Sequence, residues 1–177
     1  SISAPGIADD QVAALINSVV AALLAHHFSL PTFKSESPKP PALKQIRAVG
    51  LAHRIDFTRT VVEARANNLA RWLTALPPNK LDAKGYRQAI EQLSTQHGWK
   101  YKFLDEKSLS KLGAGAFLAV SQGNANRDAG IVHLSYRPKL NNTKRTQPDV
   151  ALVGKGIIFD TGGTNLKPFK AMLDMHH

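Results

Sequence analysis

Two long stretches of the chain carry apolar side chains at spacings of three and four, a period that predicts amphipathic helices. In residues 9–27 the stripe consists of Val12, Leu15, Ile16, Val19, Val20, Leu23 and Leu24. Asp9 and Asp10 precede it, at the positive end of the expected helix dipole. From Asp56 onward the stripe consists of Val61, Val62, Leu69, Trp72, Leu73 and Leu76. Pro77-Pro78-Asn79 follows, and proline cannot continue a helix. The pattern therefore predicts two long helices.

Shorter patterns follow after residue 80. Asp82 is a suitable cap for a helix to about Gln96, with Gly98 as its terminator. Aromatic residues then alternate with lysines, a period of two that predicts a strand with one buried face, at Trp99, Tyr101 and Phe103. A short helix is predicted over 106–112, capped by Asp105 and closed by Gly113.

Further apolar runs predict strands at 117–120, 131–136 and 150–153, and a short edge strand is predicted at 47–52. Helices that alternate with strands indicate an α/β fold in which helices flank a layered sheet. In such sheets ligands bind outside the carboxyl ends of the strands. Lys155 and Asp160 follow the last predicted strand at such a position.

The composition is that of a globular chain, with 177 residues and 43% apolar content. No apolar run approaches the roughly 20 residues that span a bilayer. The segment Ser1-Ile2-Ser3-Ala4-Pro5 lacks the basic and then apolar layout of a signal peptide. We therefore expect a cytoplasmic protein without a membrane partner.

The net charge of +10 raises the question of nucleic-acid binding. The basic residues are scattered and few aromatics lie among them; examples are Lys34, Lys39, Lys44, Arg47, Lys139, Lys144 and Arg145. A solvated surface, or a piece whose acidic remainder is missing, explains the charge equally well. The absence of cysteine excludes disulfides and thiolate sites, so any metal must have oxygen and nitrogen ligands.

The candidate functional residues lie in 150–168, where Lys155 and Asp160 interrupt an apolar segment that is rich in glycine. A charge among core residues is costly unless it is paired or bound to a metal. The glycines suggest a phosphate loop, but the spacing is not that of a Walker motif. A second hypothesis is covalent catalysis by a lysine or serine nucleophile, but the sequence shows no base that would activate it. Two interpretations remain open. Lys155 and Asp160 form an ion pair and the glycines make turns, or the segment is a metal site. Asp160 beside two glycines suits a hard cation, and a lysine near a dication can become a neutral donor.

The same residues carry a family resemblance. Val153-Gly154-Lys155-Gly156, Phe159-Asp160-Thr161-Gly162-Gly163 and Leu166-Lys167-Pro168 resemble the core signature of the leucine aminopeptidases, the di-metal cytosol aminopeptidases. Upstream, Asn68-Leu69-Ala70-Arg71 with Pro77-Pro78-Asn79 resembles the entry into their catalytic domain, and 113–123 resembles their glycine-rich segment. The resemblance covers essentially the whole chain, more loosely before residue 56.

The resemblance implies a role for each matching residue. Lys155 would be a neutral lysine ligand to one metal, Asp160 would bridge both metals, and Lys167 would keep its proton and polarise the scissile carbonyl. Met172 and Met175 would lie near the pocket for the N-terminal side chain of a peptide substrate, although simple packing is an equal alternative for Met172. The implied reaction is leucyl-type, two-metal hydrolysis with Zn²⁺ or Mn²⁺, in a homohexamer.

The resemblance also implies that parts of the pattern are missing. The next metal-ligand aspartate is expected one residue beyond His177, and further acidic ligands would follow. We therefore expect 1–34 to be the end of an N-terminal domain with its final helix, 35–55 a linker, and 56–177 the first part of a truncated catalytic domain. By itself, this piece should be inactive.

Alternative interpretations concern the two histidine pairs and the function of the whole chain. His176-His177 is interpreted as native rather than as the start of a purification tag, and His26-His27 as surface residues at a helix end rather than a metal pair. The chain as a whole could instead be a non-catalytic basic module that binds nucleic acid or a partner chain.

Overall fold

The computed structural model describes residues 9–35, 43–49, 51, 53–138 and 150–176. The chain divides into two compact units, Ser1–Leu76 and Pro77–His177. Each unit has its own secondary structure and its own small core, so the two are treated separately below.

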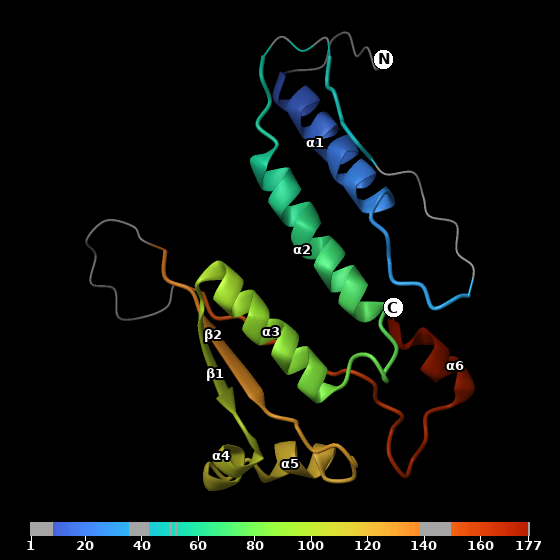
Figure 1. Ribbon diagram of the computed structural model, residues 1–177, viewed down its shortest axis with the longest axis vertical. Coiled ribbons are helices and arrows are strands. Elements are labelled where there is room, and N and C mark those ends of the chain that lie inside the picture. Colours follow the sequence, from blue (N-terminus) through green and yellow to red (C-terminus); the bar gives the residue numbers. More distant parts are fainter. Residues whose placement is uncertain (1–8, 36–42, 50, 52, 139–149, 177) are drawn as a thin grey trace. The chain divides into compact units, whose positions relative to one another are not determined.

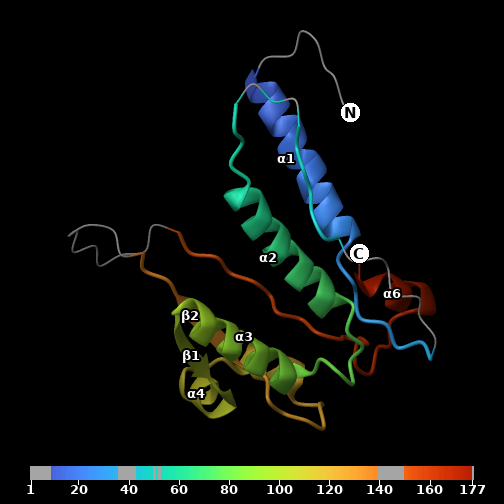
Figure 2. The ribbon, with the colours of Figure 1, turned by 45° about the horizontal axis from the view of Figure 1, so that its top comes forward.

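Unit 1 is built from two helices, α1 (Asp9–His26) and α2 (Thr58–Thr74), which lie side by side in both views (Figures 1 and 2). Val20 of α1 and Ala64 of α2 are buried. The two helices themselves confirm those that the period of three and four predicts.

Polar side chains of α2 hold the end of α1. The buried Asn68 donates its Nδ2 to the carbonyl of Leu24 at 3.2 Å, and an Arg71 Nη1 donates to the carbonyl of Ala25 at 2.8 Å. The same Arg71 nitrogen donates to Asn68 Oδ1 at 2.8 Å. The last carbonyls of a helix lack partners within it, so these donors replace water at the end of α1.

Unit 2 combines helices with a two-stranded sheet. Its elements in chain order are α3 (Ala83–His97), β1 (Lys100–Leu104), α4 (Glu106–Lys111), α5 (Gly115–Ser121), β2 (Ile131–Ser135), α6 (Phe169–Leu173) and the 3-10 helix η1 (Asp174–His176). The strands are antiparallel, with Lys100 opposite Ser135 and Leu104 opposite Ile131. Helix α3 lies beside the strand pair (Figures 1 and 2). This confirms a mixed α/β architecture.

The predicted helix signals of unit 2 are confirmed in detail. Asp82 accepts a hydrogen bond from the Gly85 amide at 2.7 Å, and Asp105 accepts one from the Ser108 amide at 2.8 Å. The hydrogen bonds from Ser108 lower the pKa of Asp105. Gly98 and Gly113 follow α3 and α4 with φ values of 66° and 73°, a left-handed conformation that favours glycine.

The core of unit 2 lies where α3 and α4 meet the strands. Leu109 of α4 is 1% exposed. The Arg87 guanidinium of α3 lies 4.7 Å from the centre of the Phe103 ring and 2.9 Å from Asp128 Oδ2. Arg87 therefore connects α3 to β1 and to the loop before β2.

Three predicted strands are wrong for the described residues. Residues 117–120 belong to helix α5, because a short apolar run fits either element equally well. Residues 47–49 and 51 form no strand, and neither do residues 150–159. A strand needs a hydrogen-bonded neighbour, and the sheet in the described part of the chain has only β1 and β2.

The segment after residue 150 is therefore exposed rather than buried. Leu152 and Val153 are 92% and 98% exposed, and Lys155 and Asp160 are exposed as well. The inference that these two charges stand in a core is corrected by this structure.

No described helix has the length and apolarity to cross a membrane.

Candidate active site

A closed turn at residues 160–167 forms the candidate site. The Asp160 carboxylate accepts a hydrogen bond from the Gly162 amide through Oδ1 at 2.8 Å, and the Lys167 amide donates to the Thr161 carbonyl at 2.8 Å. Gly162 and Gly163 have φ values of 93° and 71°. A β-carbon at Gly162 would overlap the Asn165 carbonyl oxygen, so the turn requires glycine there.

This turn places Lys167 next to two other candidate residues. Its Nζ lies 3.7 Å from Asp160 Oδ2 and 3.8 Å from Met175 Sδ. The side chains of Lys167 and Asp160 are 34% and 49% exposed, so water reaches the pair. Met175 belongs to η1, directly after α6. A predicted metal ligand, a predicted catalytic lysine and a predicted pocket residue thus adjoin one another.

The charge environment keeps Asp160 ionised. The Gly162 amide is the main cause that lowers the pKa of Asp160, followed by the positive charge of Lys167, with a smaller contribution from Lys155. Partial desolvation opposes the shift. An ionised carboxylate with exposed oxygen is what a cation ligand requires.

The remaining predicted residues lie in the same unit but make fewer contacts. Lys155 is exposed in the extended segment, near enough to act on Asp160 through its charge. Met172 is half-buried on α6. In unit 1, His27 Nδ1 lies 3.1 Å from the Leu23 carbonyl at the end of α1, which agrees with a helix-end position for His26-His27.

Two backbone groups of the site were not predicted from the sequence, the amide of Gly162 and the carbonyl of Thr161. A signal for the first was present, since an aspartate whose carboxylate accepts from the amide two residues on is a common turn, and glycine favours it. The carbonyl contact to Lys167 closes over six residues and has no comparable sequence signature.

Asp160 and Lys155 are oxygen and nitrogen donors of the kind that Zn²⁺ or Mn²⁺ accepts. Their donor atoms suit such an ion, but two ligands are too few, because a stable site needs about four ligands. The described residues contain no group of three or more His, Cys, Asp or Glu side chains that could hold a metal ion.

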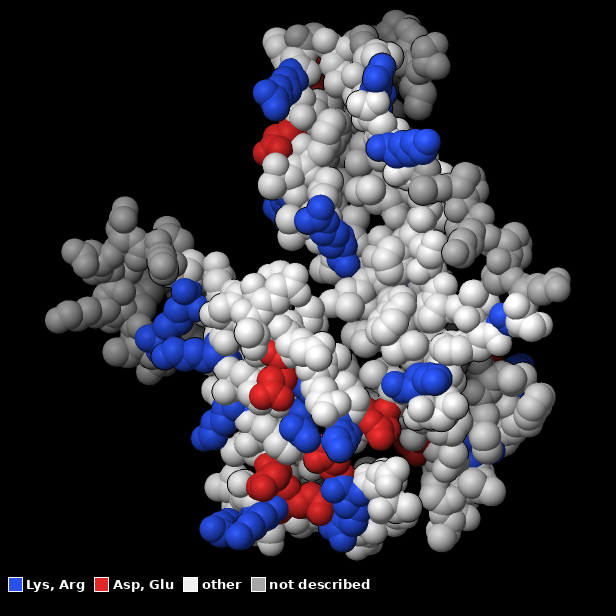
Figure 3. Space-filling model, in the orientation of Figure 1, with Lys and Arg blue, Asp and Glu red and all other residues white. Residues whose placement is uncertain are grey.

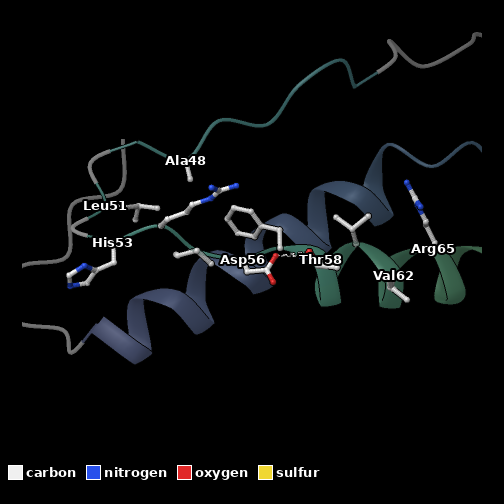
Figure 4. Close-up of a pocket in the computed structure, with 11 residues that line it drawn as sticks. Ala48, Leu51, His53, Asp56, Thr58, Val62 and Arg65 are labelled. Carbon is white, nitrogen blue, oxygen red and sulfur yellow. Dashed lines mark hydrogen bonds between the residues drawn. The ribbon is translucent and has the colours of Figure 1, made fainter. Parts of the chain in front are cut away.

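An open cavity in unit 1 does not include these residues. It has a volume of about 1010 Å³ and is lined by residues on both sides of the start of α2, including His53, Asp56 and Arg65 (Figure 4). Asp56 turns back to accept hydrogen bonds from Thr58 there, as the dashed line shows. The cavity wall therefore contains none of the predicted site residues.

Comparisons with known proteins assign the family. Residues 68–177 match the profile described as "Cytosol aminopeptidase family, catalytic domain". The chain belongs to the cytosol aminopeptidase family. The matched range contains unit 2 and the last part of α2, and it includes every predicted site residue.

Curated members of the cytosol aminopeptidase family are also similar to this chain. A "Probable cytosol aminopeptidase" of Synechococcus sp. (strain WH7803) is 36% identical over 141 residues, which cover 78% of this chain and 27% of that protein. Proteins with the same description from Synechococcus sp. (strain CC9311) and Sulfurihydrogenibium sp. (strain YO3AOP1) are 42% and 39% identical, over 60% and 59% of the chain. The chain spans 21% and 19% of those two proteins, so it covers about a quarter or less of each relative. No solved structure matches the chain.

Substitution Gly162→Ala should open the turn of this cytosol aminopeptidase signature. The added methyl group would overlap Asn165 and crowd the Lys167 amide, at a backbone φ that side chains rarely adopt. We expect the Gly162 and Lys167 amides to lose protection from hydrogen exchange, by about tenfold or more. Gly154→Ala is the matched control, because nothing lies within 4 Å of its added carbon. Equal protection in the two variants would contradict the turn.

Proposed function

We propose that the chain supplies Lys155, Asp160 and Lys167 to the active site of a metal-dependent aminopeptidase, which releases N-terminal residues from peptides by two-metal hydrolysis. The observation that carries this proposal is the contact of Lys167 with both Asp160 and Met175, within a segment that matches the catalytic domain of the family. The relatives' description as probable cytosol aminopeptidases supports it.

Each side chain has a distinct task in this proposal. Asp160 and Lys155 would hold the divalent ions, Zn²⁺ or Mn²⁺, with Asp160 as a carboxylate ligand to both and Lys155 as a neutral amine ligand to one. The ions supply an activated water and Lewis acidity when bound. Lys167 keeps its proton and donates to the carbonyl oxygen of the first peptide bond, where negative charge develops. Met175 and Met172 line the pocket for the substrate's first side chain, since methionine adapts to varied apolar shapes.

The proposal includes a wider fold than the described sheet. The described strands would belong to a layered sheet flanked by helices, because Val150, Leu152 and Val153 are 73%, 92% and 98% exposed and need a covering layer. Residues 1–34 would be the end of an N-terminal domain with its final helix, 35–55 a linker, and 56–177 the first part of the catalytic domain. A cytoplasmic homohexamer, as the resemblance implies, belongs to the same proposal.

Two donors cannot hold two ions, so we propose that residues 1–177 alone are inactive. The experiment therefore uses a chimera in which residues 1–177 are followed by the part of the Synechococcus sp. (strain WH7803) relative that comes after its region of similarity. We expect it to hydrolyse leucine amide but not N-acetyl-leucine amide. Activity should disappear with EDTA and return with Zn²⁺ or Mn²⁺. A folded chimera that is inactive with either ion would contradict the proposal.

The alternative function, a basic module that binds nucleic acid or a partner chain, has less support. Acidic and basic side chains are interspersed over the face of unit 2 in Figure 3. Several of its basic groups are paired, including Arg87 with Asp128 and Arg127 with Glu106. An affinity for DNA that falls steeply with salt and ignores substitutions at Lys155 and Asp160 would favour this alternative.

A further inference from the structure

The Lys167 ammonium contacts a sulfur atom as well as a carboxylate. Its Nζ donates to Met175 Sδ at 3.8 Å and at the same time lies 3.7 Å from Asp160 Oδ2. A thioether sulfur is a weak acceptor, so Met175 contributes little to the hold on the ammonium in its reduced form. The proposed function uses Met175 only as an apolar pocket residue, and it assigns no role to the chemistry of the sulfur.

Methionine is the residue type in this chain that a mild peroxide oxidises most readily. The sequence contains two methionines, Met172 and Met175, and no cysteine that would compete for the oxidant. Both methionines are half-buried, so a small oxidant in water reaches them to a similar degree. They differ in their neighbours, because the sulfur of Met172 takes part in none of the hydrogen bonds of the described residues. Met172 is therefore an internal reference for Met175.

Hydrogen peroxide converts the Met175 thioether into a sulfoxide. A sulfur lone pair forms a bond to one peroxide oxygen, the O–O bond breaks, and the departing oxygen takes the proton of the transferred oxygen and leaves as water. The sulfur loses two electrons and the peroxide gains them. The Lys167 ammonium keeps its proton but donates to the departing oxygen, where negative charge develops close to the sulfur. Met175 should therefore react faster than Met172.

The sulfoxide product binds the ammonium more strongly than the thioether does. Oxidation replaces an apolar, weakly accepting sulfur with a polar S–O group whose oxygen carries partial negative charge. A hydrogen bond from an ammonium to such an oxygen is charge-assisted and correspondingly strong. The flexible stem of Lys167 lets Nζ reach this oxygen without opening the turn, which the bond from the Lys167 amide to the Thr161 carbonyl holds closed.

We propose that Met175 is a selective and reversible oxidation site: peroxide converts it to the sulfoxide, and the sulfoxide oxygen holds the Lys167 ammonium. A methionine sulfoxide reductase, supplied with two electrons by thiols, returns the sulfur to the thioether and releases the oxygen as water. The effect on activity rests on the proposed function. An ammonium held by the sulfoxide cannot polarise the substrate carbonyl, and a polar oxygen would enter an apolar pocket.

The first measurement locates the oxidation in the full 177-residue chain. The chain is treated with hydrogen peroxide, and mass spectrometry of its peptides gives the oxidised fraction of each methionine over time. We expect Met175 to react about threefold faster than Met172 or more, the effect of one hydrogen bond of ordinary strength. Lys167→Leu should remove the difference, while circular dichroism confirms that the variant keeps its helices. Equal rates for the two methionines in the unchanged chain overturn the proposal.

The second measurement follows the Lys167 amine. Acetic anhydride acylates only the neutral amine, so an ammonium held by the sulfoxide reacts more slowly. After oxidation, we expect the acylation rate of Lys167 to fall by about threefold or more, and treatment with methionine sulfoxide reductases to restore it. Lys170 is the reference in the same sample, because it is exposed and forms none of the described ion pairs. An equal fall at Lys170 overturns the proposal.

Met175→Leu and Met172→Leu form a matched pair of variants, since each removes one sulfur and roughly conserves the side-chain volume. Peroxide should slow the acylation of Lys167 in Met172→Leu but not in Met175→Leu. The same response in both variants, or no response in the unchanged chain, overturns the proposal.

None of these measurements requires catalysis, so they separate the oxidation site from the proposed function. Their failure overturns the oxidation site and leaves the aminopeptidase proposal in place. An inactive chimera contradicts the aminopeptidase proposal and leaves the coupling between Met175 and Lys167 in place.

Discussion

Replacement of Asp160 by Asn should reduce the hydrolysis of leucine amide by the chimera about 10³-fold or more. The substitution keeps the shape of the side chain but removes the negative charge that would bridge two dications, and metal ions contribute several kcal/mol of transition-state stabilisation in such sites. The amide oxygen of Asn can still accept from Gly162, so the turn is expected to persist. Initial rates at saturating Zn²⁺ or Mn²⁺ measure the effect.

The matched control for this experiment is Asp174→Asn. Asp174 is exposed, lies in the same unit at the start of η1, and forms none of the described ion pairs. We expect the control to keep at least about half of the activity, since an exposed substitution seldom changes a site by more than a few tenths of a kcal/mol. If Asp160→Asn is as active as Asp174→Asn, Asp160 has no part in catalysis.

Substitution Gly130→Ala should destabilise unit 2. A β-carbon at Gly130 would lie 2.5 Å from the carbonyl oxygen of Leu104 and 2.5 Å from two ring carbons of Phe103. Neither the backbone of β1 nor a ring that packs against Arg87 can move away freely. Overpacking of this kind costs about 1–3 kcal/mol and occasionally more. Thermal or urea denaturation of the 177-residue chain measures the change.

Gly123→Ala provides the comparison for this prediction, because its added carbon meets nothing within 4 Å. It should leave the free energy of unfolding within about 0.5 kcal/mol of the original value, or raise it slightly by restricting the unfolded chain. A Gly130→Ala variant as stable as Gly123→Ala would mean that β1 and the chain before β2 do not approach as closely as described.

Elements with a local signal could be predicted from the sequence. The helices α1 to α4 are marked by apolar period, by the caps Asp82 and Asp105, and by terminators such as Gly98. The strands β1 and β2 are marked by alternation and by an apolar run. Runs without such markers were ambiguous, because the apolar residues of 117–120 fit a helix as well as a strand. The segment after Val150 was ambiguous for a related reason, because an apolar run does not reveal whether a neighbouring strand is present to pair with it.

The candidate site was predictable in its residue types but not in its contacts. Lys155, Asp160 and Lys167 stand out as charges in a glycine-rich segment that matches a family signature. The direct pairing of Lys167 with Asp160 was not predicted, because it depends on the backbone closure between Thr161 and Lys167. Closure of this kind follows from the conformations of Gly162 and Gly163 together, which a residue pattern does not specify.

The central claim is that Asp160 holds metal ions in the active site to which this chain contributes. The most direct test is the metal content of the dialysed chimera, measured by mass spectrometry for the original sequence and for Asp160→Asn. We expect about two Zn²⁺ or Mn²⁺ ions per chain in the original and a marked loss in the variant, because the proposed function assigns the Asp160 carboxylate to both ions. Two ions per chain in both proteins would contradict it.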